Sequence, residues 1–132
     1  MNKLADALMS GRLILTAECL PPRGSDPGAV RSFSSGLPES LDAVVVADNP
    51  DAIRASAFSA ARILVREGRT GVVLSMATRD RNRIALLSDA MGAAALDIDA
   101  VLCMSGNHQS VSVCPQAAAA NDIDSIQFTQ AM

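Results

Sequence analysis

The sequence predicts an α/β fold in which parallel strands alternate with helices, and three observations support this prediction. Short apolar runs alternate with longer stretches of helical period, at intervals of roughly 30 residues, as expected for βα units. The strand-like runs are apolar without polar alternation, as in a parallel sheet covered by helices. Four such units fit into the 132 residues, a length that suits a single domain. The periodicity alone fits an open sheet as well as a barrel.

The first βα unit begins with an expected strand at residues 13–18, which a proline pair closes. Ser25 or Asp26 then caps a helix, because both side chains can accept hydrogen bonds from free backbone N–H groups. Pro27 suits the first position of that helix, where no N–H donor is needed. The expected order is therefore strand, tight loop and helix.

The second unit has an expected strand at residues 41–46, followed by the polar segment 48–50. Asp51 is expected to start the helix and Gly68 to end it, because glycine readily adopts the conformation that terminates helices. The apolar stripe of this helix consists of Ile53, Ala57, Ala60, Ala61, Leu64 and Val65.

The third unit has an expected strand at residues 71–76 and a polar segment that leads into a helix. Asp80 is a suitable cap for that helix, because a short acidic side chain can accept from the first free N–H groups. The residues that follow at helical spacing are Ile84, Leu87, Ser88, Met91, Ala94 and Ala95.

The fourth unit has an expected strand at residues 100–104 and a polar, alanine-rich loop that extends to Asn121. Asp122 or Asp124 then caps a last helix. A short amphipathic helix at residues 2–9 precedes the first strand, and in a barrel it would plug the bottom. We therefore expect one partial α/β domain over residues 1–132, with four βα units behind a leading helix.

Composition and charge exclude several classes of function. Eleven Lys and Arg residues against fourteen Asp and Glu give a net charge of -3, the wrong sign for binding a phosphate backbone, so nucleic acid is disfavoured. The apolar runs are too short to cross a bilayer, and the start of the chain does not resemble a secretory signal. Cys19, Cys103 and Cys114 form no CxxC pair, so reduced thiols are expected. These features predict a cytoplasmic protein.

Polar residues follow each expected strand, at the edge of the sheet where parallel α/β folds bind their ligands. They are Glu18, Asp48 with Asn49, residues 75–79 and residues 105–108. Glu18 ends an apolar strand, where desolvation would raise the carboxyl pKa toward the range useful for proton donation. The alternative is a structural carboxylate that accepts from a loop amide or pairs with an arginine.

Two further candidate sites have structural alternatives. Arg79, Arg81 and Arg83 surround an expected helix start, where a ligand phosphate or carboxylate could dock. In the alternative, these arginines lie on a solvated helix face and pair with Asp80 and Asp89. The lone histidine, at position 108, and the three cysteines could form a Cys₃His zinc site, but their spacing gives no support, and no metal site is expected.

Five segments, at 16–24, 47–50, 79–96, 105–109 and 122–127, carry a more specific pattern than the periodicity. The first resembles the opening strand of methylenetetrahydrofolate reductases, where a glutamate precedes a Pro-Pro pair. The second (ADNP) is similar to TDNP in short bacterial members of that family, and the third is similar to RDRNRIALQSDLLGAAALG. The last two, SGNHQ and DIDSIQ, are similar to SGDHQ and DLDSIQ. The order and spacing also match, over almost the whole chain.

This resemblance implies the first half of a TIM-type (β/α)₈ barrel and a flavoprotein of one-carbon metabolism and methionine biosynthesis. FAD would accept hydride from NAD(P)H or another donor and reduce 5,10-methylenetetrahydrofolate to 5-methyltetrahydrofolate. Glu18 matches the general acid, which protonates the folate nitrogen as its five-membered ring opens. The positions that match flavin-lining loops are Asp48, Ser75, Ser105, Gly106, Asn107 and His108.

The chain departs from the family pattern at several positions. Ala47 replaces a threonine, Ala77-Thr78 replaces Thr-Cys, and Asn107 replaces an aspartate whose charge would stabilise a cationic folate intermediate. The chain is also about half as long as the family's barrel. We therefore expect a second copy or a complementary subunit to complete the barrel. The alternatives are a non-catalytic flavin- or folate-binding or assembly module, and a truncated, inactive fragment.

Overall fold

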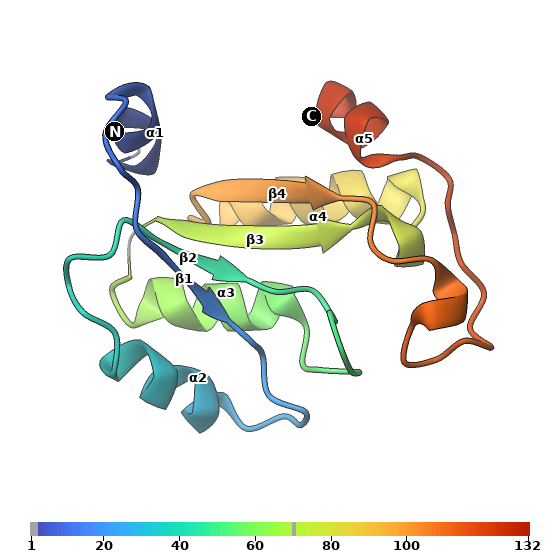
Figure 1. Cartoon of the computed structure of the whole chain (residues 1–132), viewed down its shortest axis with the longest axis horizontal. Helices are drawn as coiled ribbons and strands as arrows, with labels where there is room; N and C mark the ends of the chain where they lie inside the picture. Colours follow the sequence, from blue (N-terminus) through green and yellow to red (C-terminus); the bar gives the residue numbers. More distant parts are fainter. Residues whose placement is uncertain (1–2, 70) are drawn as a thin grey trace.

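The computed structural model describes residues 3–69 and 71–132, and strands alternate with helices along them (Figure 1). The strands are β1 (Thr16–Cys19), β2 (Ala43–Val46), β3 (Val72–Ala77) and β4 (Ala100–Met104). The helices are α1 (Lys3–Met9), α2 (Pro27–Ser35), α3 (Ala57–Arg66), α4 (Arg83–Ala95) and α5 (Ser125–Ala131). Two short 3₁₀ helices, η1 (Thr78–Asp80) and η2 (Gln109–Val111), lie in the loops after β3 and β4.

The four strands form one parallel sheet in the order β1-β2-β3-β4, which confirms the predicted α/β class. The register places Glu18 beside Val45, Val45 beside Val73, and Val73 beside Ala100. Paired residues of neighbouring strands project to the same side of a sheet. Glu18 therefore shares one face of the sheet with this row of apolar side chains.

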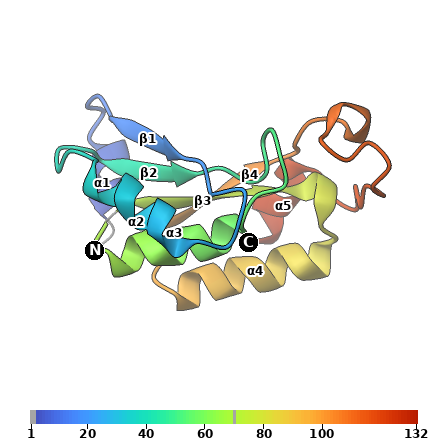
Figure 2. The ribbon, with the colours of Figure 1, turned by 90° about the horizontal axis from the view of Figure 1, so that it is seen from below.

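The opposite face of the sheet carries the main core. Figure 2 shows α3 and α4 beneath the strands, with α2 beside α3. One core cluster joins alternate strand residues such as Leu74 and Met76 to Val30 of α2, Leu64 of α3 and Leu86 of α4. The other face is more open, since Glu18 is exposed and Val45 and Val73 are only half-buried. We call these two surfaces the covered face and the open face.

The two ends of the sheet have different surroundings. Figure 1 shows α1 beyond the amino-terminal ends of the strands, while the loop that contains η2 lies beyond their carboxyl-terminal ends. Leu4 and Ala7 of α1 are buried. The predicted leading helix is thus present from Lys3 onward, while its first expected residue, Asn2, lies outside the described residues. Among the described helices, none is long and apolar enough to cross a membrane.

Helix caps explain where α2 and α5 begin. Asp26 accepts the N–H of Gly28 at 2.8 Å, and Pro27 occupies the first position of α2, as predicted. Asp124 caps α5 through a reciprocal pair of bonds with Gln127, which is a capping box. The fully buried Phe128 then anchors α5 in the core.

The prediction that α3 starts at Asp51 is wrong, because α3 begins at Ala57 with Ser56 at its N-cap position. The Asp51 carboxylate is instead bound by two guanidinium nitrogens of Arg54, at 2.7 and 2.9 Å. Asn49 also accepts the backbone N–H of Arg54 at 2.8 Å. These local bonds hold the segment before Ser56 as a loop, and Ile53 is consequently exposed instead of lying in the apolar stripe.

The prediction that Asp80 caps α4 is also wrong. Its carboxylate is bound by Arg79, whereas Asn82 accepts the N–H of Ala85 at 3.0 Å and caps the helix. Ile84 and Met91 of α4 are exposed, so only part of the expected stripe faces the core.

The strand ends differ slightly from the predicted ones. The strand β1 starts at Thr16. The N–H of the residue before it, Leu15, donates to the side-chain carboxylate of Asp42 at 2.9 Å instead of to a backbone carbonyl of β2. The strand β4 has the predicted bounds. Before β3, Gly71 has φ +72°, and a Cβ there would lie 2.1 Å from the carbonyl oxygen of Asp42. Only glycine fits this crossing of two backbones.

Candidate functional site

Asp48, a predicted flavin-lining residue, is buried at the carboxyl-terminal end of β2. One carboxylate oxygen accepts the N–H of Ala77 at 3.0 Å and Nη1 of Arg81 at 2.6 Å. This pairing raises the pKa of Arg81, although burial of the guanidinium opposes the shift. Asp48 therefore joins the ends of β2 and β3, and its charge is already neutralised by a protein partner.

A small hollow of about 110 Å³ brings together three of the predicted positions, Asp48, Gly106 and Asn107. Arg79 forms part of its wall, and its Nη1 donates to the backbone carbonyl of Asn107 at 3.1 Å. Gly106 has φ +79°, and a Cβ there would lie 3.4 Å from the Cβ atoms of Ala77 and Arg79. The glycine thus allows the loop after β4 to turn close against the end of β3.

A larger hollow of about 380 Å³ lies beside the first and shares Asn49, Pro50, Arg79 and Asn107 with it. Apolar side chains of the loop after η2 and Ile53 supply much of the remaining wall. The volume falls within the roughly 300–1,000 Å³ that is typical of small-molecule sites. We call these two neighbouring hollows the rim site.

Gln109 lines the larger hollow and carries an unusual acceptor. Its Nε2 donates to the carbonyl of Cys114 at 2.6 Å and to the hydroxyl of Ser112 at 3.0 Å. The Cys114 carbonyl requires a donor, which fixes the orientation of the amide. Its Oε1 is buried and has no hydrogen-bond partner within the described parts of the chain. Buried acceptors without a partner are rare in folded proteins, so this atom is an acceptor whose hydrogen-bonding capacity is unused.

Glu18 does not line the rim site. Its side chain is exposed on the open face of β1, which is an end strand of the sheet. The predicted desolvation of this carboxyl group is therefore wrong for the single chain, because β1 has a neighbouring strand on one side only. The Glu18 carboxylate is accessible from the open face, and β1 lies at the opposite end of the sheet from β4, the strand that precedes Asn107.

The remaining predicted positions have different surroundings. Ser75 is buried within β3, and its register partner is Leu102. Ser105 is exposed, and its hydroxyl lies 3.1 Å from that of Ser125 at the start of α5. His108 is exposed at the start of η2, where its Nδ1 accepts the N–H of Ser110 at 3.2 Å. Of the six predicted flavin-lining positions, three line the rim site, and Ser75, Ser105 and His108 do not.

The arginines around the start of α4 are all paired, which favours the structural alternative over an anion site. Arg79 binds Asp80, and Arg81 binds Asp48 and, at 3.5 Å, Asp89. Arg83 binds Asp122 through its backbone N–H and its guanidinium. The bonds from Arg83 lower the pKa of Asp122 to about 2. The pairs with Asp80 and Asp89 match the alternative, whereas Asp48 and Asp122 were not expected as partners. Arg79 also differs from the alternative, because it is buried in η1 instead of lying on a solvated helix face.

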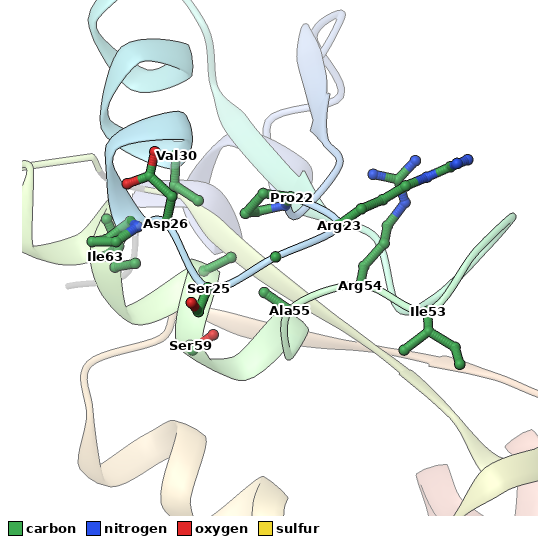
Figure 3. A pocket seen from close by; sticks show the side chains of 13 residues that line it. Pro22, Arg23, Ser25, Asp26, Val30, Ile53, Arg54, Ala55, Ser59 and Ile63 are labelled. Carbon is green, nitrogen blue, oxygen red and sulfur yellow. The ribbon is translucent and has the colours of Figure 1, made fainter.

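A third hollow, of about 500 Å³, lies between the loops after β1 and β2 and the first turns of α2 and α3 (Figure 3). Figure 3 shows Arg23 and Arg54 at one end, while Val30 and Ile63 lie at the other. Arg54 donates to the carbonyl of Pro21 at 2.8 Å and binds Asp51, so each of its three guanidinium nitrogens already has a partner within the protein. This hollow contains none of the predicted site residues.

The cysteines do not form a metal centre with His108. Cys19 lies in the core on the covered face, and burial raises the pKa of its thiol to about 11. Across residues 3–69 and 71–132, no group of three or more His, Cys, Asp or Glu side chains could hold a metal ion.

Sequence reasoning missed Gln109 and Arg54 as residues of the carboxyl-terminal edge. A signal for Gln109 exists in the sequence, because it is the last residue of the SGNHQ segment that follows β4. Arg54 gave no signal, because its contact with Pro21 joins two loops that are far apart in the sequence. The geometry is thus the main guide to function, since the chain matches no protein-family model, no curated protein and no solved structure.

Proposed function

We propose that the chain is one half of a (β/α)₈ barrel of the methylenetetrahydrofolate reductase type. The sequential strand order, with α2, α3 and α4 on one face, supports this architecture. Barrels have this arrangement, whereas in doubly wound open sheets the strand order reverses partway along the sheet and helices cover both faces. The position of α1 beyond the amino-terminal ends of the strands also suits a barrel (Figure 1).

We propose that the function is reduction of 5,10-methylenetetrahydrofolate to 5-methyltetrahydrofolate, with FAD as cofactor and NAD(P)H as a candidate donor. The observation that carries this proposal is the convergence of three motif-bearing segments on the rim site. These segments contain Asp48, Arg79 and Asn107, and they come from the ends of β2, β3 and β4. The remaining half of the barrel would come from a second copy or a complementary subunit.

The rim site has features that fit a flavin. The isoalloxazine ring has one imide N–H, and Gln109 Oε1 is a buried acceptor without a partner among the described residues. Asn107 and Asn49 add amide groups to the wall, and Ile53 and Val111 add apolar surface. This mixture of apolar walls and a few directed polar groups is typical of cofactor sites. When bound, FAD would supply two-electron transfer to the folate.

The chain's own residues would donate the proton and hold the loops around the cofactor in place. Glu18 would donate a proton to the folate nitrogen from the open face, where a substrate can reach it. Asp48, held by Arg81 and Ala77, would fix the distance between the ends of β2 and β3 beneath the cofactor. Gly106 and the Asn107 carbonyl would hold the loop after β4 against Arg79.

A non-catalytic binding module is the second candidate function, and two observations favour it. Asn107 is neutral where the family has an aspartate, so the stabilisation of a cationic intermediate is weaker. In addition, Glu18 is exposed in the single chain, so water surrounds the group that would have to protonate a bound substrate. Such a module would bind flavin or folate, or take part in an assembly, without turnover. A truncated, inactive fragment is the third reading, and it predicts neither binding nor turnover.

Flavin binding and folate reduction together test the proposal. We expect the purified chain to bind FAD, with a visible flavin spectrum, and to form 5-methyltetrahydrofolate when a reductant is supplied. Glu18→Gln should abolish the folate product while flavin binding persists. Glu39→Gln, at another exposed glutamate outside the site, is the matched control and should leave both unchanged. A protein that ignores added FAD would contradict the proposal, and FAD binding without product would favour the non-catalytic module.

Asn107→Asp gives a second test of the same proposal. The substitution restores the family's charge and keeps the backbone carbonyl that accepts from Arg79. We expect the rate of folate reduction to increase by about tenfold or more, because a carboxylate stabilises developing positive charge better than an amide does. An unchanged rate, with FAD bound, would show that position 107 does not contact the reacting centre.

A further inference from the structure

The two end strands of the sheet, β1 and β4, each have a neighbouring strand on one side only. Unpaired edges expose backbone N–H and C=O groups that bind other strands, and soluble proteins usually cover them. Both edges belong to a parallel sheet and run in the same direction. The outer edge of β1 and the outer edge of β4 are therefore complementary. A parallel strand that pairs with the outer edge of β4 must offer the edge that β1 leaves unpaired, and the reverse also holds.

The open face also has an incomplete apolar surface. Leu102 of β4 is 43% exposed, and Val45 and Val73 in the middle of the sheet are half-buried. These side chains lie on one face by register, and Glu18 is the charged residue among them in β1. A partner that covered this face would bury apolar surface, which favours association.

We infer that a second copy of this chain covers both edges and the open face. A two-fold axis that coincides with the axis of the barrel would place β4 of each copy beside β1 of the other. Both pairs would be parallel, and two four-strand sheets would close into eight strands with their helices outside. A second copy satisfies both edges at once because each chain carries both kinds of edge. This inference rests on the barrel architecture of the proposed function. It identifies the other half of that barrel as a second copy of this chain.

Closure would change the surroundings of Glu18. In the single chain this carboxylate is exposed on an end strand. In the closed pair it would lie inside the barrel, between Val45 of its own chain and a β4 strand of the partner. The partner would therefore complete the site, and the acid of each copy would act in a cavity that neither copy forms alone.

Sedimentation of the 132-residue chain over a range of concentrations tests this inference without a ligand. We expect a species of twice the chain mass of 13.7 kDa, with a monomer on dilution. Leu102→Glu places a charge in the proposed contact and should weaken the dimer by at least about a hundredfold. Met91→Glu, at an exposed apolar residue on α4, is the matched control and should leave the dimer unchanged.

Hydrogen exchange of the wild-type chain supplies a measurement that needs no variant to fold. The backbone amides of β1 and β4 that face outward should become protected as the protein concentration rises, whereas the exchange of β2 should change little. A monomer at every concentration would overturn the inference, as would a dimer whose β1 and β4 exchange does not change. A dimer that weakens equally with Met91→Glu would also overturn it. A dimer without flavin binding would leave the inference standing and count against the proposed function.

Discussion

The covered and open faces belong to the same four strands but differ in how deeply their side chains are buried. On the covered face, Leu74 and Met76 of β3 are buried in a cluster with residues of α3, which precedes β3, and of α4, which follows it. On the open face, Leu102 and Glu18 remain exposed. The difference shows that the βα repeat supplies a helical layer for one side of the sheet and none for the other. Stability and function are therefore expected to depend on different faces.

The largest effect is expected from Leu74→Ala on the covered face. Removing this buried side chain should lower the free energy of unfolding by about 3 kcal/mol, because a cavity remains in the core. Leu102→Ala, on the open face, should cost less than about 1 kcal/mol in dilute protein. Urea unfolding of both variants measures the difference. If a second copy covers Leu102, the cost of Leu102→Ala should grow with protein concentration. Equal costs in dilute protein would contradict the distinction between the faces.

A smaller loss of stability is expected from removing the buried carboxylate of Asp48, and a still smaller one from neutralising the exposed carboxylate of Glu18. Asp48→Ala leaves Arg81 without its closest partner and should destabilise the chain by about 2 kcal/mol, since Arg81 is partly exposed. Glu18→Gln should change the stability of the dilute chain by less than about 0.5 kcal/mol. Thermal or urea unfolding tests both. A stable Asp48→Ala protein would mean that Asp48 does not hold the ends of β2 and β3 together.

The reactivity of Cys19 tests how tightly the covered face is closed. Burial raises the pKa of this thiol to about 11, so little thiolate exists at pH 8. In a Cys103→Ser/Cys114→Ser background, we expect thiol reagents to modify folded Cys19 at least about a hundredfold more slowly than the unfolded chain. Fast labelling of the folded protein would indicate that the layer around Cys19 opens readily.

The smallest effect is expected from the ion pair that joins the start of α4 to the segment before α5. Bonds from Arg83 lower the pKa of Asp122 to about 2, so the pair stabilises the fold fully above pH 4. This contribution is lost as the pH falls toward 2. Arg83→Gln should raise the pKa of Asp122 toward its ordinary value of about 3.9, as an NMR titration would show. The change in stability should be small, because exposed pairs are screened by water and salt.

Much of the fold could be predicted from the sequence, because the relevant signals are local. The apolar run of β4 and the caps Asp26 and Asp124 act through residues close by in the chain. The start of α3 could not be predicted, because the Asp51 carboxylate bonds to Arg54 instead of capping a helix. A carboxylate such as that of Asp51 can bind either the N–H groups of a helix start or a guanidinium. The three-dimensional positions of these groups decide between them, and the sequence pattern does not contain those positions.

The candidate site was less predictable than the fold. Asp48, Gly106 and Asn107 meet because the carboxyl ends of parallel strands lie at one edge of the sheet, which the order of elements along the chain already implies. The exposure of Glu18 depends on which strand lies at the end of the sheet, and the free acceptor of Gln109 depends on a loop conformation. Both are properties of the folded chain.

The sequential strand order also has a consequence for how the protein is made. Thr16 pairs with Ala43, Val44 with Val72, and Val73 with Ala100, so the paired residues are 43 − 16 = 27, 72 − 44 = 28 and 100 − 73 = 27 positions apart. Each new strand can therefore dock on the previous one as soon as one further unit has left the ribosome. Synthesis can proceed as the repeated addition of one module, and the last strand added is always the one ready to receive another.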